Sequence, residues 1–101
     1  MIILNTTFIV EDARLEEFYA WARHTYLPAM DLAGIFTDKM MARVTTRVEP
    51  GATSVAIQAR TATMEQGQRW HDDPAAILRD DLVARFNGQA LFFTTYMEIV
   101  D

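Results

Sequence analysis

The first side chains that could do chemistry are two amides inside apolar segments, Asn5 and Gln58. An amide in an apolar environment costs free energy unless it is hydrogen-bonded. Asn5, with Thr7 beside it, could therefore orient the carbonyl group of a substrate. Alternatively, Asn5 bonds to Gln58 or to a threonine across a sheet, and Gln58 allows the same two interpretations.

Charged and aromatic side chains add further candidates. A planar guanidinium binds a carboxylate through two parallel hydrogen bonds, so Arg43 and Arg60 could hold an anionic ligand. Alternatively, these arginines pair with Glu98 of the same subunit or of a second one. Tyr96 is close to Glu98 in the sequence, and the two could form an acid–base pair. Trp70 could stack on a ligand, or it could anchor the core or an interface.

Composition excludes several kinds of chemistry. The chain has no cysteine, so it has no disulfide, thiolate metal site or thiol nucleophile. His24 and His71 lack the spacing of a helical zinc pair, and we expect no metal and no cofactor. A net charge of −5 argues against a nucleic-acid partner. We find neither a secretion signal nor an apolar run long enough to span a bilayer, and we expect a cytoplasmic protein without a membrane partner.

The elements that must position these residues alternate in the order strand, helix, strand, strand, helix, strand. Segments rich in β-branched and aromatic residues, several of them with a period of two, predict the strands, and apolar residues three and four apart predict the helices. The predicted strands cover residues 1–10, 37–48, 55–60 and 91–100, and the predicted helices cover residues 12–34 and 63–87.

The first predicted helix contains an interruption. Asp12 suits its N-cap, and Gly34 suits its end. Pro28 is tolerated only in a first helical turn, so we expect a kink or a fresh start near Thr25, which could cap the second segment.

The second predicted helix opens with a capping box, in which Thr63 and Gln66 each satisfy a backbone N–H group of the other. Asp73 and Pro74 then resemble a second N-cap followed by proline at the first helical position. We therefore expect this helix to be split in two.

This order, with helical crossovers and one tight hairpin, indicates an α+β ferredoxin-like fold: a four-stranded antiparallel sheet with both helices on one face. A length of 101 residues suits a single domain covering residues 1–101. Because 50% of the residues are hydrophobic, we expect part of the apolar surface to be covered by a second subunit of a homodimer.

The other face of the sheet then carries a mixture of aromatic, aliphatic, amide and charged groups. If alternate residues point to opposite faces, the residues expected to face the helices are Leu4, Phe8, Val44, Ile57 and Phe93. The residues expected on the helix-free face are Asn5, Thr7, Ile9, Met41, Arg43, Thr45, Gln58, Arg60, Phe92, Thr94, Tyr96 and Glu98. This face could pack against its own copy and enclose a small ligand, or it could be an ordinary solvated face with surface ion pairs.

Three stretches resemble a known family. They are the opening M-I-I-L-N-T-T-F-I-V-E-D, the segment from Trp21 to Tyr26-Leu27-Pro28, and the closing residues 96–101. They resemble the bacterial family known as domain of unknown function 4286, which brings no activity and no site. The family is similar in architecture to the dimeric α/β-barrel superfamily, whose members include cofactor-free monooxygenases, haem-degrading enzymes, isomerases and ligand-binding modules. That similarity implies a fold rather than a function.

One comparison with this superfamily can be made residue by residue. Haem-degrading members use an Asn on the first strand, a Trp on the second helix and a His further along that helix. Asn5 and Trp70 occupy similar places, but His71 directly follows Trp70, about 100° round a helix. The positions where the ligand would be expected carry Arg79, Asp80 and Asp81. Without an axial imidazole, the sequence argues against haem.

The sequence thus leaves three functions open. The first is binding of a small anionic or aromatic molecule on the helix-free face, and the second is a cofactor-independent enzyme of monooxygenase or isomerase type. The third is a structural or partner-binding dimer without a ligand. The candidate ligand-binding residues are Asn5, Thr7, Arg43, Gln58, Arg60, Trp70, Tyr96 and Glu98.

Overall fold

The computed structural model describes residues 1–47 and 49–101. Its strands are β1 (Ile2–Glu11), β2 (Thr37–Arg43), β3 (Ala52–Thr61) and β4 (Ala90–Glu98). Its α-helices are α1 (Leu15–Trp21), α2 (Leu27–Ala33), α3 (Met64–Asp72) and α4 (Pro74–Phe86). A short 3-10 turn, Asp12–Arg14, precedes α1, and a π-helical segment, Ala22–Tyr26, joins α1 to α2.

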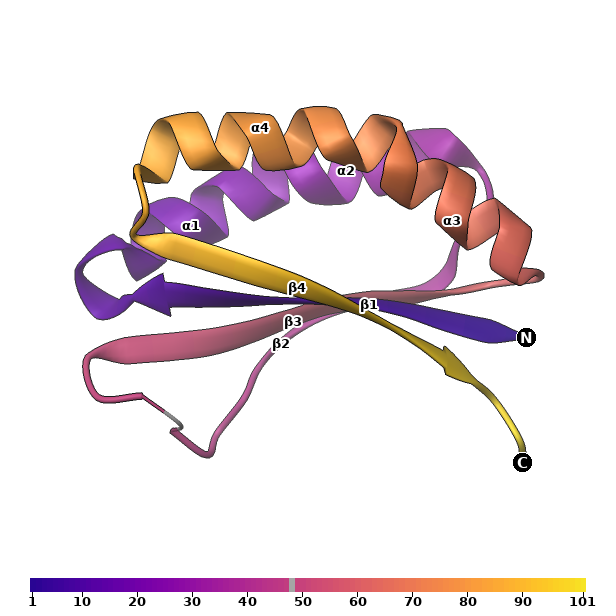
Figure 1. Cartoon of the computed structure of the whole chain (residues 1–101), viewed down its shortest axis with the longest axis horizontal. Coiled ribbons are helices and arrows are strands. Elements are labelled where there is room, and N and C mark those ends of the chain that lie inside the picture. The colour runs from indigo at the N-terminus through magenta and orange to yellow at the C-terminus, as the bar shows by residue number, and fades with distance from the viewer. Residues whose placement is uncertain (48) are drawn as a thin grey trace.

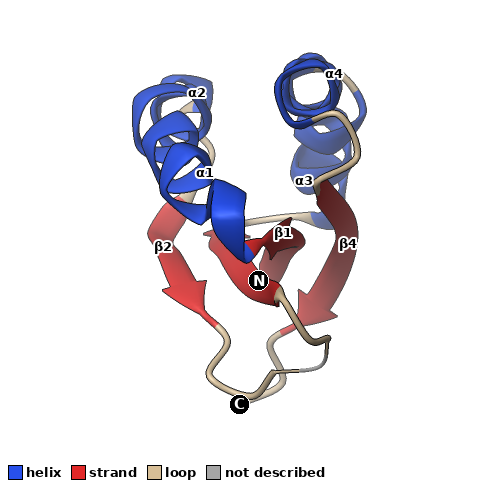
Figure 2. Cartoon of the chain, turned by 90° about the vertical axis from the view of Figure 1, so that its left-hand side faces the viewer, coloured by secondary structure: helices blue, strands red, loops and turns tan. Residues whose placement is uncertain are grey.

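The four strands form one antiparallel sheet in the order β2-β3-β1-β4. Two helical arms, α1–α2 and α3–α4, lie side by side on the same face of this sheet (Figures 1 and 2). This confirms the predicted α+β architecture with its helices on one face. We call the face beneath the helices the covered face, and the opposite one the open face.

The core lies between the covered face and the helical arms. Phe8 on β1 is fully buried at its centre, with ring centroids 5.0 Å from Phe18 and 5.5 Å from Tyr26. Burying such aromatic side chains removes a large apolar area from water, and this burial drives the two arms onto the sheet.

The first arm differs from its prediction at both predicted N-caps, Asp12 and Thr25. Asp12 does not cap a helix: its carboxylate accepts hydrogen bonds from Thr53 and Arg47 instead. These bonds lower the pKa of Asp12. Thr25 begins no new segment, because the helix continues through the π-helical turn.

That π-helical turn reflects Pro28, which has no N–H group to donate to the carbonyl group four residues earlier. The Leu27 N–H group bonds instead to the Ala22 carbonyl group, five residues back. The wider turn keeps Ala22, Tyr26 and Met30 all buried against the sheet. The arm ends at Gly34, which has φ 69° as expected for a left-handed C-cap.

The second arm is split at Asp73 and Pro74, as predicted. At its start the Gln66 N–H group donates to the Thr63 hydroxyl group over 3.2 Å, so one half of the capping box forms. The other half does not form, because the Gln66 side-chain carbonyl group has no hydrogen-bond partner among the described residues. Asp73 occupies the N-cap position of α4 without a side-chain bond.

The strands differ from their predicted lengths at several ends. β2 ends at Arg43, earlier than predicted, and the predicted last residue, Val48, lies outside the described residues. β3 begins at Ala52, three residues earlier than predicted, and β4 ends at Glu98. Across the described ranges, no helix has the length and apolar character that a bilayer crossing requires.

Candidate functional site

The open face is organised as four rows that run across the sheet. Residues paired directly on neighbouring strands lie on the same face, so the register defines each row. From β2 to β4, the rows are Thr37–Arg60–Ile3–Met97, Met40–Gln58–Asn5–Thr95, Ala42–Ala56–Thr7–Phe93 and Val44–Ser54–Ile9–Leu91.

The register shows which of the predicted site residues lie on the open face and which lie on the covered face. Asn5, Thr7, Gln58 and Arg60 lie on the open face, as predicted for them and for Ile9. Leu4, Phe8 and Ile57 lie on the covered face, also as predicted.

The predicted orientation of β4 is wrong. Tyr96 pairs with Leu4, Thr94 with Thr6, and Phe92 with Phe8, so all three β4 residues lie on the covered face. Glu98 is also an even-numbered position of β4, so it belongs to the same side, and it lies exposed at the strand end. Phe93 points to the open face, where 52% of its surface is exposed.

The predicted orientation of β2 is wrong as well. Met41 pairs with Ile57 and Arg43 with Val55, which places both on the covered side, whereas Val44 lies on the open side. The physical reason is an irregularity between Thr37 and Met40, where Asp38 has φ 52°. One extra residue reverses the facing of every side chain that follows. Thr45, assigned to the same set, lies beyond the end of β2.

The remaining candidates do not join the open-face group. Trp70 on α3 is buried among the rings of Tyr26 and Phe36, with centroids at 5.8 and 5.0 Å. Arg43 and Glu98 belong to the two edge strands, so they do not pair with each other within one subunit. Arg60 pairs with Asp38 over 3.4 Å.

The centre of the open face is polar. Asn5 donates from Nδ2 to the Thr7 hydroxyl group over 3.0 Å, and Gln58 lies directly opposite Asn5 on β3. Apolar side chains flank this centre. On the β4 edge, 59% of the surface of Leu91 is exposed, and Met40 on the β2 edge is 51% exposed.

The covered face contains a second polar group, which the sequence did not predict. His71 on α3 has Nδ1 at 3.0 Å from the Asp72 carboxylate and Nε2 at 3.1 Å from the Thr94 hydroxyl group. Thr94 in turn lies 3.2 Å from the Thr6 hydroxyl group. These contacts form a carboxylate–imidazole–hydroxyl relay that runs from solvent into the core. The long-range pairing of Thr6 with Thr94, together with the packing of α3 on the sheet, brings its parts together.

Two tyrosines border this relay. Burial raises the pKa of Tyr26, and a side-chain hydrogen bond with Thr6 opposes that shift. Burial also raises the pKa of Tyr96, and the negative charge of Asp72 adds to the shift. The Tyr96 ring meets the His71 ring edge to face, with centroids 5.9 Å apart. A relay of this kind can move a proton to or from a bound molecule.

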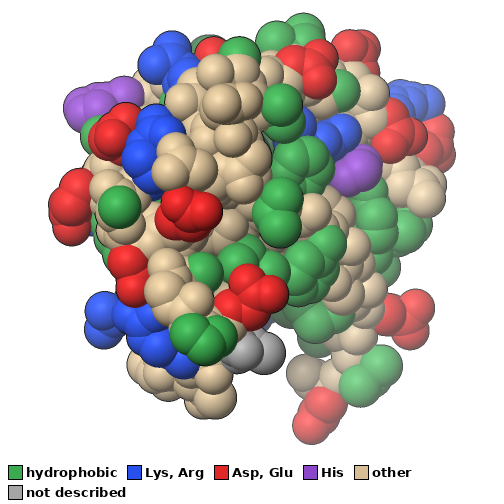
Figure 3. All heavy atoms as spheres, turned by 60° about the vertical axis from the view of Figure 1, so that its left-hand side comes forward, with side chains coloured by type: hydrophobic (Ala, Val, Ile, Leu, Met, Phe, Trp, Pro, Cys, Tyr) green, Lys and Arg blue, Asp and Glu red, His purple; other side chains and the backbone are tan. Residues whose placement is uncertain are grey.

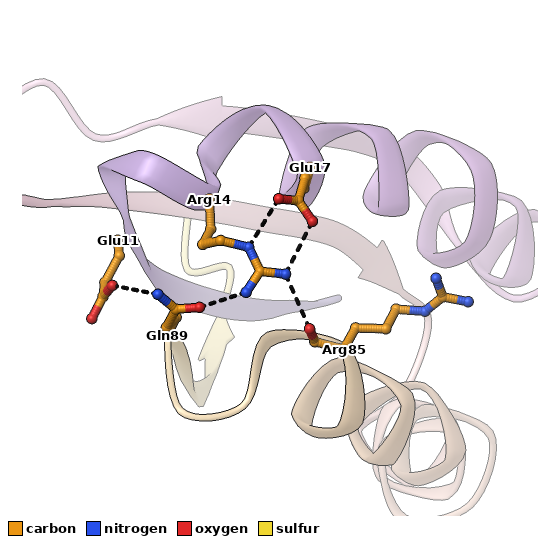
Figure 4. A network of polar contacts seen from close by, with 5 residues as sticks. All are labelled: Glu11, Arg14, Glu17, Arg85 and Gln89. Carbon is orange, nitrogen blue, oxygen red and sulfur yellow. Dashed lines mark hydrogen bonds and ion pairs between the residues drawn. The ribbon is translucent and has the colours of Figure 1, made fainter.

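A third polar group fastens the two arms together at the end of the sheet where β1 meets the first helix (Figure 4). Arg14 donates to Glu17, to Gln89 and, over 3.0 Å, to the Arg85 carbonyl group in the last turn of α4. The carbonyl groups in the last turn of a helix have no partner within that helix, and Arg14 satisfies one of them. Gln89 also donates to Glu11 over 2.9 Å.

A groove of about 480 Å³ adjoins this network, between α1 and the end of α4. Arg14 lines it, stacked 4.7 Å from the Phe86 ring centroid, and its guanidinium already makes the bonds described above. The network therefore ties the arms together rather than presenting a free cation. Across residues 1–47 and 49–101, no group of three or more histidine and carboxylate side chains is placed to hold a metal ion.

The sequence model of the family described as "Domain of unknown function (DUF4286)" matches residues 1–100. The chain belongs to this family. No curated protein matches this DUF4286 chain at a significant level.

Solved structures resemble the DUF4286 chain in fold. HapK from Hahella chejuensis has a TM-score of 0.72 at 10% identity, over 99% of this chain and 93% of that one. A dimeric ferredoxin-like protein from an uncultured marine organism has a TM-score of 0.66 at 13% identity, over 99% and 96%. A monooxygenase from the gene ActVA-Orf6 of Streptomyces coelicolor, in complex with Nanaomycin D, has a TM-score of 0.58 at 15% identity, over 99% and 91%. Likeness at these identities confirms the ferredoxin-like fold and carries no activity.

Proposed function

We propose that this protein is a homodimer that binds a small organic molecule, and that the open faces of two copies form its interface. The observation that carries the proposal is the composition of the open face. Apolar side chains on both edges and a polar centre are exposed together on this face. Figure 3, a view from the side of the sheet rather than onto its open face, shows further hydrophobic side chains gathered in a band. Contiguous exposed apolar patches of this kind mark interaction sites.

The size of the face suits a stable dimer. Strands of up to ten residues at ~3.3 Å each, in a sheet of four strands ~4.8 Å apart, give roughly 600 Å² before side chains and loops are added. A standard interface buries about 800 Å² on each partner. Similarity to a structure described as a dimeric ferredoxin-like protein supports a dimer.

The rows of the open face are also self-complementary. The third row has small side chains, Ala42 and Ala56, at its β2 end and the large Phe93 ring at its β4 end. A two-fold axis parallel to the strands would place Phe93 of one copy over Ala42 of the other. It would also bring the two copies of Asn5 and Gln58 together, where amides can bond to each other rather than remain buried and unpaired.

Engineered cysteines test this geometry directly, because the natural chain has no cysteine. Facing sheets lie about 10 Å apart, beyond the reach of a direct disulfide, so the double variant Ala42→Cys/Phe93→Cys should form a covalent dimer with a short bifunctional maleimide. Ile77→Cys, on the outer side of α4 and 69% exposed, is the matched control and should stay monomeric on a denaturing gel. If both variants cross-link equally slowly, the proposed interface is wrong.

Replacement of Phe93 tests the interface without any cross-link. Phe93→Arg should weaken the dimer about 30-fold or more by sedimentation, as expected for a central aromatic side chain. Ile77→Arg should leave the dimer unchanged. The small molecule would lie between the two sheets, against Asn5, Thr7, Gln58 and Arg60, and native mass spectrometry would detect it as added mass on the dimer.

A second candidate function is proton transfer catalysed without a cofactor, and the Asp72–His71–Thr94 relay favours it. His71 Nε2 would exchange its contact with the Thr94 hydroxyl group for the carbon acid and take its proton, with Asp72 holding the imidazole ring through Nδ1. Deuterium uptake by a 1,3-diketone in D2O tests this. His71→Gln should abolish any catalysed exchange, and Asp72→Asn should reduce it. Equal exchange rates in the natural protein and in His71→Gln would exclude this function.

A further inference from the structure

A groove separates the end of α2 from the junction of α3 and α4. It has a volume of about 430 Å³, within the range of about 300–1,000 Å³ that is typical of small-molecule sites. Its apolar walls come from Ala33, Ile35, Trp70 and Pro74, and its polar groups come from Gln66, Arg69 and Asp73. A neighbouring hollow of about 320 Å³ shares Trp70 and extends along α2.

Two polar atoms in the residues that line this groove are buried without a hydrogen-bond partner in the described part of the chain. They are the indole Nε1 of Trp70 and the side-chain Oε1 of Gln66. Only 4% of the Trp70 surface is exposed. Because buried polar groups are almost always paired, each exception needs an explanation. One atom is a donor and the other an acceptor, and they lie one turn apart on α3.

The rest of the chain shows how such groups are normally satisfied. The other tryptophan of the chain, Trp21, donates from Nε1 to Asp81 over 2.8 Å. The sequence pattern assigns Gln66 to a capping box, where its carbonyl group would accept from the Thr63 N–H group. That bond is not formed, so the Gln66 carbonyl group is available to another partner.

The charges around the groove limit what it can hold. Arg69 is mostly exposed and pairs with Glu65 over 2.6 Å, and the Asp73 carboxylate lies on the same rim. A carboxylate ligand could accept from Trp70, but it has no hydrogen to offer Gln66. A neutral group that combines a carbonyl oxygen with an N–H serves both atoms.

We infer that this groove binds a neutral, planar aromatic molecule that carries a carboxamide or lactam group. Both atoms are covered in this structure, so the Gln66 side chain turns toward the groove when the ligand enters. The ligand carbonyl oxygen then accepts from Trp70 Nε1, and the ligand N–H donates to Gln66 Oε1. The aromatic ring lies along the apolar wall of Ala33 and Pro74. The inference rests on the ligand-binding part of the proposed function, and it adds the site and the chemical class.

Nuclear magnetic resonance of ¹⁵N-labelled protein tests the inference, because the chain has only two indole N–H signals. Trp21→Phe and Trp70→Phe assign them. Addition of benzamide should move the Trp70 signal to saturation and leave the Trp21 signal in place, because the Trp21 indole is bonded to Asp81. Benzoate, which lacks the N–H group, should bind about tenfold more weakly.

Two variants complete the test. Gln66→Leu should lower the affinity for benzamide about tenfold and leave that for benzoate unchanged. Gln68→Leu, at an exposed position of the same helix, is the matched control and should change neither. A Trp70 signal that ignores benzamide, or that moves equally in Gln66→Leu, would overturn the inference and would indicate that the two atoms bond to each other or to water.

The same spectra separate this inference from the proposed function. If benzamide, benzoate or a naphthoquinone moves backbone signals near Asn5 and Gln58, or near His71, but not that of Trp70, ligand binding stands and this site is wrong. If none of the three probes moves any signal while the dimer is intact, the ligand-binding part of the proposal fails with it.

Discussion

The two faces of the sheet are built from the same four strands, yet they satisfy their side chains in different ways. On the covered face, Phe8 is fully buried among rings of the first helical arm and Phe92 of β4, and the hydroxyl groups of Thr6 and Thr94 bond to each other. On the open face, Phe93 is about half exposed. The covered face is complete within one chain, whereas the open face exposes apolar side chains on both edges of a polar centre.

The difference teaches that residue type alone does not decide which face of this sheet is covered. Phe92 and Phe93 are adjacent and identical, but Phe92 contacts the Phe8 ring at 6.4 Å and Phe93 points away from the core. What decides is the hydrogen-bond register with β1. The following predictions compare matched positions on the two faces, beginning with the largest expected effect.

The largest difference is expected between the two phenylalanines that are most unlike in burial. Phe8→Ala should lower the free energy of unfolding by about 3–5 kcal/mol, because it leaves a cavity among packed rings. Phe93→Ala should cost less than about 1 kcal/mol at a dilution where only monomer is present. Urea denaturation of both variants measures this. Equal losses would mean that the open face is already packed within one chain.

Alkaline pH should reveal the buried phenol of the covered face. The pKa of Tyr26 is raised in the folded state above its ordinary value of 10.0, so its stabilising contribution is complete below pH 10 and is lost as pH rises through the folded pKa. Stability should fall there by about 1.4 kcal/mol per pH unit for each such group. Tyr26→Phe should flatten this slope in denaturation curves recorded between pH 9 and 11. Tyr19→Phe, at a partly buried position of α1, is the control.

Adjacent threonines on β4 offer a matched pair for the polar groups. Thr94→Val should cost about 1 kcal/mol, because it removes the partner of the buried Thr6 hydroxyl group. Thr95→Val, at an exposed position of the open face, should be neutral or slightly stabilising. Thermal denaturation separates them, and a larger loss for Thr95→Val would reverse the assignment of the two faces.

The smallest effect concerns the approach of α3 to the covered face. A Cβ atom added at Gly67 would lie 3.5 Å from the Thr61 hydroxyl oxygen and 3.7 Å from the Tyr96 ring, which are ordinary contact distances. Gly67→Ala should therefore raise the free energy of unfolding by about 0.5–1 kcal/mol through helix propensity. A destabilised variant would show that the helix sits closer to Tyr96 than these distances state.

Much of the fold could be predicted from the sequence, because its signals are local. Alternation places Leu4 and Phe8 opposite Asn5, the Thr63 cap starts α3, and Gly34 ends α2. These features depend on residues that are close together in the chain. The order of elements then limits the topology to a few choices, of which the observed one is the commonest for such a pattern.

The facing of β2 and β4 could not be predicted in the same way. Each strand contains neighbours of one kind, Met40–Met41 in β2 and Phe92–Phe93 with Thr94–Thr95 in β4. A shift of one residue leaves the apolar pattern of such pairs unchanged, so alternation cannot choose between faces. The choice is made by long-range pairing, and the His71 relay and the Trp70 groove depend on contacts of the same long range.

The π-helical turn at Ala22–Tyr26 has a consequence for the history of the first arm. A turn closed over five residues instead of four is what remains when one residue is inserted into a regular helix and everything beyond it keeps its place. A chain that lacks Arg23, an exposed residue of this turn, and also carries Pro28→Ala should close it into an ordinary α-helix and still bury Tyr26 and Met30.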